Sequence, residues 1–190
     1  MQVSNTLLRD VKLLSPRRFE DERGWFAEFF NASTFLAHGL PTHFVQDNQS
    51  VSSRGVLRGL HYQLGRPQGK LVRVLHGHIW DVAVDLRPSS PDFGKHAAFH
   101  LRPLTPEGQL QLLWIPEGFA HGFLVLSPTA EVLYKTTDLY HPASERCIPW
   151  DDATLAIPWP LELLDGQLPS ISPKDSRGTP FLQADLPPAS

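Results

Sequence analysis

Two of the nine histidines in this 190-residue chain stand in segments whose other residues narrow the possible chemistry. Lys70 lies nine residues after His61. His121 ends the segment Pro-Glu-Gly-Phe-Ala-His at residues 116–121. Neutral imidazoles bind divalent metals, usually together with carboxylate or thiolate ligands. An imidazole can also remove a proton near neutral pH, because its ordinary pKa is about 6.5. The neighbours of the two histidines therefore decide between a metal site and a proton-transfer site.

The first segment resembles the first metal-binding motif of cupin barrels, which has a glycine, His-x-His, a glutamate and a second glycine. Gly55, His61 and Gly77 fit this motif, but Gln63 replaces the second histidine and Lys70 replaces the glutamate. A lysine ammonium cannot bind a metal cation and repels it. We therefore expect no metal at this site. A metal-dependent cupin remains an alternative that elemental analysis would test.

The second cupin motif, a glycine followed by Pro-x-Gly-x-x-His, is matched by Gly108 and residues 116–121. Val125 replaces the asparagine that usually follows. Together the two motifs predict an all-β, cupin-type jelly-roll barrel. The His-Gly-His sequence at residues 76–78 falls at an expected turn, so we interpret it as an exposed tight turn.

Without a metal, these residues can move protons. His61 could remove a proton beside a ketone, and Lys70 could stabilise the resulting enolate oxygen. Inversion also needs an acid on the other face of the substrate, which a tyrosine hydroxyl can provide. Tyr62 neighbours His61 and should point away from it on a strand, so Tyr134 and Tyr140 are the better candidates.

The composition is that of an ordinary globular protein, with 41% apolar and 19% charged residues. A net charge of −3 argues against a nucleic-acid or membrane-surface partner. The first ten residues lack the apolar run of a signal peptide, and no segment approaches the length of a membrane span. The single cysteine, Cys147, excludes an internal disulfide, and we expect it to be a small structural residue. We predict a single cytoplasmic domain over residues 1–190.

Eighteen prolines separate short runs of Val, Leu, Ile and Phe, a pattern typical of many short strands joined by turns. The expected strands lie at residues 11–14, 25–30, 44–52, 56–63, 70–75, 79–86, 95–101, 109–115, 122–126 and 131–138. Two-residue alternation places Gln46, Asn48 and Ser50 on one face of their strand.

One short helix is predicted at residues 31–38, with Asn31 as its N-cap and Gly39 after its end. Beyond Tyr140 the chain is expected to be irregular and to wrap the barrel, with a helical turn near residues 159–164. Residues 178–190 are expected to form a mobile tail.

A series of segments in order along the chain resembles the successive signatures of dTDP-4-dehydrorhamnose 3,5-epimerases. These segments are residues 21–28, 46–50, 55–63, 68–73, 81–87, 116–123, 134–135 with 140, and 172–175. The resemblance runs from about residue 7 to residue 175. It implies a cofactor-free epimerase that converts dTDP-4-dehydro-6-deoxy-D-glucose to dTDP-4-dehydro-β-L-rhamnose, for O-antigen or cell-wall polysaccharide. It also implies a homodimer, in which a strand near the N-terminus completes the partner's sheet.

The resemblance also implies roles for individual residues. His61 would be the base at C3 and C5, with Asp175 bonded to its ring. Tyr134 would be the acid on the opposite face, and Lys70 would lie by the C4 oxygen. Tyr140 would stack on the thymine ring. The ligand site would be lined by Arg23, Glu28, Gln46, Asp47, Asn48, Arg58, Lys70, His121, Tyr140, Glu145 and Lys174.

Two alternatives stay open besides the metal cupin. The first is a single-site epimerase or ketoisomerase on a related dTDP-keto-sugar, although the presence of Tyr134 favours double inversion. The second is a sugar-binding cupin without activity, which would need no proton donor opposite a base. For Asp85 we expect a buried residue that stabilises a turn.

Overall fold

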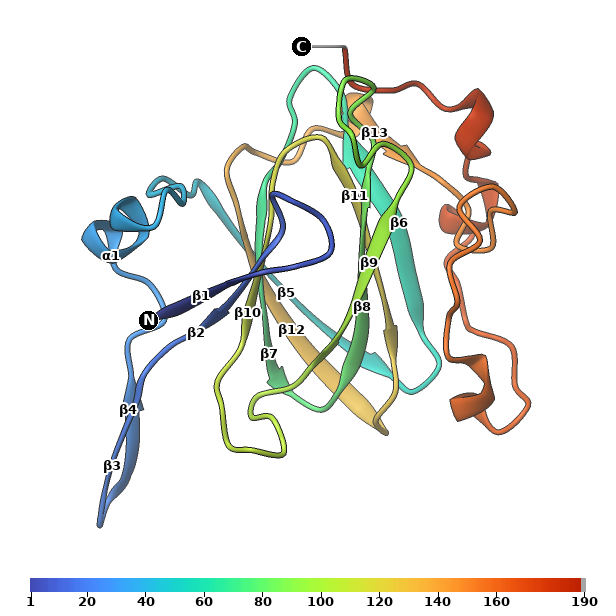
Figure 1. Cartoon of the computed structure of the whole chain (residues 1–190). Coiled ribbons are helices and arrows are strands. Elements are labelled where there is room, and N and C mark those ends of the chain that lie inside the picture. The colour runs from blue at the N-terminus through green and yellow to red at the C-terminus, as the bar shows by residue number, and fades with distance from the viewer. Residues whose placement is uncertain (189–190) are drawn as a thin grey trace.

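The computed structural model describes residues 1–188, and its barrel consists of two antiparallel sheets that face each other (Figure 1). The first sheet contains, in spatial order, β1 (Gln2–Asn5), β2 (Lys12–Ser15), β10 (Leu112–Ile115), β7 (Lys70–His76), β12 (Thr129–Thr136) and β5 (Gln46–Ser53). The second contains β13 (Glu145–Cys147), β6 (Leu57–Gln63), β11 (Phe119–Val125), β8 (Ile79–Asp85) and β9 (His96–Leu101). The predicted all-β, cupin-type jelly roll is confirmed.

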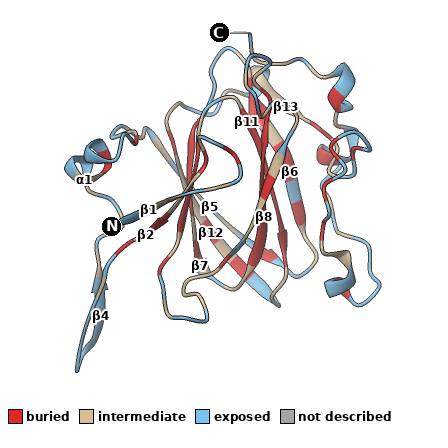
Figure 2. Ribbon diagram, viewed as in Figure 1, coloured by how far each residue is buried: buried red, intermediate tan, exposed pale blue. Residues whose placement is uncertain are grey.

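The middle of the second sheet is buried on both faces, as β8 shows. Ile79 and Ala83 belong to the apolar cluster between the two sheets. Trp80, Val82 and Val84 belong to a second cluster on the outer face, beneath the C-terminal segment. All seven residues of β8 are therefore buried, as the red strands of Figure 2 show. The burial on both faces agrees with the sequence, in which five of the seven strand positions are apolar.

A hairpin and a helix leave the barrel near the N-terminus (Figure 1). The hairpin consists of β3 (Arg18–Asp21) and β4 (Gly24–Ala27), which pair only with each other. The helix α1 (Ala32–Ala37) is confirmed, and the Asn31 side chain accepts hydrogen bonds from the first-turn amides as predicted. The strand predicted at 25–30 ends earlier, because Phe30 turns away and packs edge-on against Phe35 of the helix.

The C-terminal segment packs along the outer face of the second sheet (Figure 1). It contains 3-10 turns at Leu161–Leu164, Asp175–Arg177 and Phe181–Gln183. The first of these confirms the helical turn expected near residues 159–164. None of the helices in residues 1–188 has the length and apolar character needed to cross a bilayer.

Residues 178–188, which were expected to form a mobile tail, pack on the barrel, while residues 189–190 lie outside the described part of the chain. Phe181 is buried and its ring packs on that of Phe93. The Tyr62 hydroxyl donates a hydrogen bond to the Asp185 carbonyl at 2.7 Å. These contacts cover apolar surface of the second sheet, which is the physical reason for the order of the tail.

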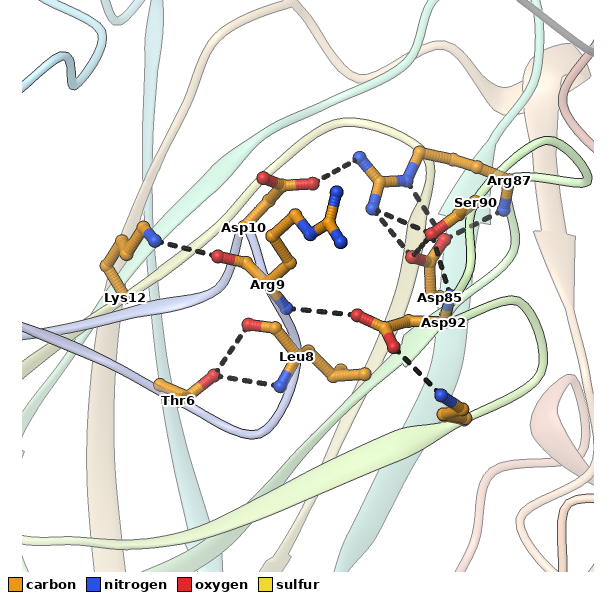
Figure 3. A network of polar contacts seen from close by, with 10 residues as sticks. Thr6, Leu8, Arg9, Asp10, Lys12, Asp85, Arg87, Ser90 and Asp92 are labelled. Carbon is orange, nitrogen blue, oxygen red and sulfur yellow. Dashed lines mark hydrogen bonds and ion pairs between the residues drawn. The ribbon is translucent and has the colours of Figure 1, made fainter.

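A polar network ties the loop between β1 and β2 to the turn after β8 (Figure 3). Arg87 donates to Asp85 at 2.6 Å and to Asp10 at 2.8 Å, and the Ser90 hydroxyl also donates to Asp85. Burial opposes ionisation of Asp85, but these hydrogen bonds outweigh it and hold the pKa of the carboxyl below its usual value. The structure thus confirms Asp85 as a buried residue that stabilises a turn.

Most predicted strands are found with ends shifted by one to three residues, and three short strands were missed: β1, β3 and β13. Each missed strand has only three or four residues and lies at a sheet edge or in the hairpin, so its sequence carries little alternation. The strand predicted at 109–115 begins at Leu112, because Gln109 closes a turn with Thr105.

Candidate active site

A cavity of about 340 Å³ opens between the two sheets. It is lined by nine of the residues expected to be catalytic or to bind the ligand. These are Gln46, Asn48, Arg58, His61, Lys70, His121, Tyr134, Tyr140 and Glu145. The remaining lining residues are Ser50, Tyr62, Gln63, Gln68, Gly122 and Phe123.

The first sheet contributes Tyr134 and Lys70 to one wall of the cavity. Tyr134 on β12 lies opposite Asn48 of β5, and Thr136 lies opposite both Gln46 and Lys70. Because side chains alternate along a strand, these residues share the inner face of the sheet. The predicted alignment of Gln46, Asn48 and Ser50 on one face is confirmed, since all three line the cavity.

The second sheet contributes two histidines to the opposite wall. His61 on β6 and His121 on β11 are register partners. His61 Nε2 lies 2.7 Å from Asp175 Oδ1, and His121 Nε2 lies 2.8 Å from Asp81 Oδ2. Each imidazole is thus bound to a buried carboxylate.

Asp175 reaches His61 from the 3-10 turn of the C-terminal segment. Its Oδ2 also accepts a hydrogen bond from the Gly59 amide at 3.3 Å, and its own amide donates to the Ser172 hydroxyl. Burial favours the neutral acid, but the hydrogen bond and charge of His61 outweigh it, so the pKa of Asp175 is lowered. An ionised carboxylate only accepts hydrogen bonds, so Nε2 of His61 donates to it, and in the neutral form of the imidazole Nδ1 has the free lone pair.

Gly59 allows this part of β6 to approach β11 closely. Its φ is +114°, and a Cβ atom there would lie 2.6 Å from the Gly122 Cα and from the His121 carbonyl oxygen. Any other residue would push the two strands apart or strain the backbone. The glycine between Arg58 and Leu60 therefore keeps the two histidines next to each other.

Lys70 is buried, and its Nζ donates to the His61 carbonyl at 3.1 Å. Burial lowers the pKa of Lys70 to about 8, although the negative charges of Asp81 and Glu145 oppose this shift. An amine with this pKa is largely charged at neutral pH and can stabilise an anion in the cavity.

Two of the metal-ligand positions of the cupin motif hold side chains that form hydrogen bonds within the protein instead. Gln63, in place of the second motif histidine, donates to the carbonyls of Arg66 and Leu139 and accepts from the His141 amide. Together with Lys70, this leaves an incomplete ligand set for a cation. Across residues 1–188, the one group of three or more potential ligands that lie close together is His61, Cys147 and Asp175.

Tyr134 faces the cavity from the wall opposite His61, and burial raises the pKa of its hydroxyl although the charge of Arg58 opposes the shift. Arg58 is held in place because its guanidinium donates twice to the Ser52 hydroxyl, at 3.0 and 3.1 Å. A neutral tyrosine on one wall and an imidazole on the other can act on opposite faces of one ligand.

Tyr140 and Glu145 form the rim of the cavity. The Tyr140 hydroxyl and the Lys174 ammonium both donate to the Glu145 carboxylate. The Tyr140 hydrogen bond to ionised Glu145 raises the pKa of that hydroxyl. The ring of Tyr140 is about half exposed, so it offers a face for stacking.

Comparison with known proteins identifies the family. The sequence model of the dTDP-4-dehydrorhamnose 3,5-epimerase family matches residues 5–183. The chain belongs to this family. The dTDP-4-dehydrorhamnose 3,5-epimerase of Pseudomonas aeruginosa is 51% identical over 189 residues, covering 99% of this chain and 100% of that protein. The protein of the same name from Escherichia coli K12 is 52% identical over 180 residues, covering 93% of this chain and 92% of that protein.

A solved structure of the family has the same fold. The crystal structure of dTDP-6-deoxy-D-glucose-3,5-epimerase from Legionella pneumophila, in complex with dTDP-4-keto-L-rhamnose, superposes with a TM-score of 0.90 and 45% identity. The match covers 100% of this chain and 98% of that one. The epimerase family match also extends to residue 183, beyond the end of the resemblance seen in the sequence motifs.

Four residues expected at the ligand site of this epimerase-family chain do not line the cavity. Arg23 lies at the tip of the projecting hairpin, where it pairs with Asp21, and Glu28 accepts a hydrogen bond from the Asn31 side-chain amide beyond β4. Asp47 bonds Lys135 at 2.9 Å on the outer face of the first sheet, because it alternates with Gln46 and Asn48. The fourth, Lys174, lies at the rim through its bond to Glu145.

Sequence reasoning missed Asp81 and Gln68. Asp81 lies within the segment 81–87 that carries the family resemblance, but its pairing with His121 depends on strand register. Gln68 opens the segment 68–73 and donates to the Asp138 carbonyl at 2.7 Å, which fixes the start of the loop that carries Tyr140. Both residues lie in segments that resemble the family signatures, but no role in the site had been predicted for either of them.

Proposed function

We propose that this chain is the dTDP-4-dehydro-6-deoxy-D-glucose 3,5-epimerase that forms dTDP-4-dehydro-β-L-rhamnose. The observation that supports this most strongly is the cavity with His61 bound to Asp175 on one wall and Tyr134 on the other. Inversion of a carbon needs a proton removed on one face and returned on the other, and this arrangement provides a base and an acid on opposite sheets.

In the proposed reaction, Nδ1 of His61 removes a proton from a carbon beside the C4 ketone. The electron pair of the broken C–H bond forms the C=C bond of the enolate, and the carbonyl electrons move to the C4 oxygen. The Lys70 ammonium stabilises that oxygen. Asp175 holds the imidazole in place and stabilises the imidazolium that forms, so it acts as a positioning residue.

Tyr134 then donates its hydroxyl proton to the opposite face of the same carbon, and the C–H bond re-forms with inverted configuration. The tyrosinate regains a proton from solvent, and His61 releases its proton to solvent. The sequence is repeated at the second carbon. No electrons are lost or gained overall, so we propose that neither a redox cofactor nor a metal takes part.

For the nucleotide, we propose that Tyr140 stacks on the thymine ring at the rim of the cavity. Arg58 and Lys174 would supply positive charge near the diphosphate, since cationic side chains bind phosphate oxygens well. Gln46 and Asn48 would donate to sugar or phosphate oxygens from the wall of the first sheet. This local charge compensates for the net charge of −3 on the chain.

The test is an exchange assay in heavy water with dTDP-4-dehydro-6-deoxy-D-glucose. We expect deuterium at both C3 and C5 of the product, without added metal or nicotinamide. Deuterium at one carbon alone would indicate a single-site epimerase, and stoichiometric iron, manganese or zinc needed for turnover would indicate a metal-dependent cupin.

The Tyr134→Phe variant separates proton exchange from inversion. His61 can still remove a proton and return it on the same face, so we expect exchange at C3 and C5 to continue. Inverted product should fall by about 10²-fold or more, the usual contribution of a positioned acid. Unchanged inversion in this variant would show that another group is the acid.

We also propose a homodimer in which the hairpin of β3 and β4 reaches a second copy. Phe26 of the hairpin is 69% exposed and Trp25 is 47% exposed, which is unfavourable unless another chain covers them. Within the described residues, β5 pairs only with β12, so one edge of the first sheet is open for a strand. In such a dimer, Arg23 and Glu28 would reach the partner's cavity.

Mixing two inactive variants tests this dimer. Co-refolded Arg23→Ala and His61→Ala chains form mixed dimers with one intact site, so activity should exceed that of either variant alone. A matched mixture of His61→Ala and Tyr134→Phe has no intact site, so its yield of inverted product should not exceed that of the separate variants. Light scattering that reports a monomer would contradict the dimer directly.

We infer that the chain acts in dTDP-rhamnose biosynthesis, which supplies polysaccharides such as O-antigen or cell-wall chains. A cytoplasmic location fits a nucleotide-linked substrate and a single unpaired cysteine. Fractionation of the source cells and rhamnose analysis of a deletion strain would test both inferences.

A further inference from the structure

Cys147 is next to the catalytic pair but has no part in the proposed reaction. It lies on β13 directly opposite His61 of β6. Its Sγ, a ring nitrogen of His61 and a carboxylate oxygen of Asp175 all lie within 4.8 Å of one another. Burial raises the pKa of the Cys147 thiol to about 12, so it does not compete with His61 as a base.

Sulfur, imidazole nitrogen and carboxylate oxygen form a ligand set that suits thiophilic divalent cations. Around Zn²⁺, such ligand atoms stand roughly 3.5 Å apart, given metal–ligand distances of about 2.0–2.3 Å. Small rotations of the three side chains from their present spacing would reach that geometry. The group differs from the cupin metal positions, of which it uses only His61.

The three residues come from separate elements that are fixed to one another. β6 and the end of β13 exchange two hydrogen bonds between Leu60 and Ile148, both at 3.0 Å. The Cys147 carbonyl accepts a hydrogen bond from the Thr179 amide at 2.9 Å, and Asp175 is bonded to Ser172. The scaffold of the group is therefore formed before any ion binds, which reduces the entropy lost on binding.

The charges around the thiol favour a cation. The carboxylates of Asp175 and Glu145 act on it with negative charge, and Lys174 acts with positive charge. Lys174 is itself paired with Glu145. The net charge acting on the thiol is therefore negative. The exposed side of His61 leaves a path from the cavity for the ion and for a fourth ligand such as water.

We propose that His61, Cys147 and Asp175 form a binding site for Zn²⁺ or Cd²⁺, and that the bound ion blocks the enzyme by occupying the imidazole that serves as base. On binding at Nε2 of His61, the S–H bond of Cys147 breaks, a metal–sulfur bond forms, and the thiol proton leaves to solvent. The Nε2 proton shifts through solvent to Nδ1, so the base loses its free lone pair, and no oxidation state changes. The blocking effect rests on the proposed function, whereas the binding of the ion does not.

Titration with Cd²⁺ measures the binding without any activity assay. Cys147 is the one cysteine of the chain, so an ultraviolet cadmium–thiolate band can arise from that residue alone. We expect one equivalent of Cd²⁺ per chain to saturate the band. Cys147→Ala should abolish it, and Asp175→Asn should weaken the affinity by about tenfold or more.

Inhibition is measured on the same proteins with Zn²⁺ in the exchange assay. Wild type should be inhibited and should recover when a chelator is added. Cys147→Ala should keep its basal activity and need at least about tenfold more Zn²⁺ for the same inhibition. His100→Gln is a matched control, because His78 and His100 form another histidine pair at 2.9 Å, and this variant should behave as wild type.

A missing thiolate band at excess Cd²⁺, or equal Zn²⁺ affinity of wild type and Cys147→Ala, would overturn the site. A saturated band with undiminished activity would support the site but overturn the block, and with it the role of His61 as base. If the chain has no epimerase activity at all, the band and the affinities still decide the binding.

Discussion

The two histidine–carboxylate pairs of the cavity look alike but lie in different surroundings. His61 with Asp175 and His121 with Asp81 have nearly equal distances, 2.7 and 2.8 Å, on neighbouring strands. The side chain of His61 is 31% exposed, whereas that of His121 is 8% exposed. A carboxylate partner therefore does not by itself make a histidine a base, because the ring must also be open to the ligand.

The two carboxylates also differ in their contacts. Asp175 lies on a turn of the C-terminal segment, and both of its oxygens accept hydrogen bonds. Asp81 lies inside the second sheet, is fully buried, and its Oδ1 has no partner among the described residues. We infer that the first pair is built for proton transfer and that the second is a rigid part of the wall.

Replacing each histidine with alanine should give the largest difference between the two pairs. His61→Ala removes the base, so deuterium exchange at C3 and C5 should fall by about 10³–10⁴-fold. His121→Ala should keep the exchange step and mainly raise KM, because it removes a wall contact. Equal losses of kcat in both variants would erase the distinction between the pairs.

Asparagine at each carboxylate should separate activity from stability. Asp175→Asn removes the charge that stabilises the imidazolium, so kcat should fall by about 10²-fold with little change in KM. Asp81→Asn should instead lower the free energy of unfolding by about 1–3 kcal/mol, because it disturbs a fully buried hydrogen-bonded pair. Exchange kinetics give the loss of kcat, and denaturant unfolding gives the loss of stability, for both variants. A stability loss confined to Asp175→Asn would mean that Asp175, and not Asp81, belongs to the structural pair.

The sequence predicted the parts of this comparison that lie in local motifs. His61 and Lys70 follow from the altered cupin motif, and Asp175 follows from the family resemblance. Asp81 could not be paired in advance, because its contact with His121 depends on the register of β8 and β11. Asp47 was expected at the ligand site, but its side chain bonds Lys135 on the outer face, as its alternation with Gln46 and Asn48 already indicated.

Other features were beyond the sequence because they depend on distant surfaces. Arg23 belongs to a family signature, but the signature does not say that its hairpin leaves the barrel. The burial of Phe181 depends on the outer face of a sheet formed by residues far away in the chain. The barrel class and most strands were predictable, because prolines and apolar runs mark them locally.

Lys70 donates a hydrogen bond to the His61 carbonyl, and its titration should limit activity at high pH. Its pKa is lowered to about 8 from 10.5, so the ammonium is present below pH 8 and lost above it. Enolate stabilisation, and therefore kcat, should fall toward about tenfold per pH unit above 8. In Lys70→Met the rate should be low and this alkaline limb absent. If kcat of Lys70→Met still fell above pH 8, another group would be responsible for the loss of activity at high pH.

The smallest expected effect is a change in the pKa of Lys70, which should depend on the charge of Asp81 but not on that of Asp175. Asp81 and Glu145 are the charges that raise the pKa of Lys70 against burial, and Asp175 is not among them. In Asp81→Asn the alkaline limb of kcat should therefore move to lower pH, by a fraction of a unit. In Asp175→Asn the limb should keep its position while the whole profile drops. A shift in Asp175→Asn without one in Asp81→Asn would mean that the base pair, and not the wall pair, sets the charge of the lysine.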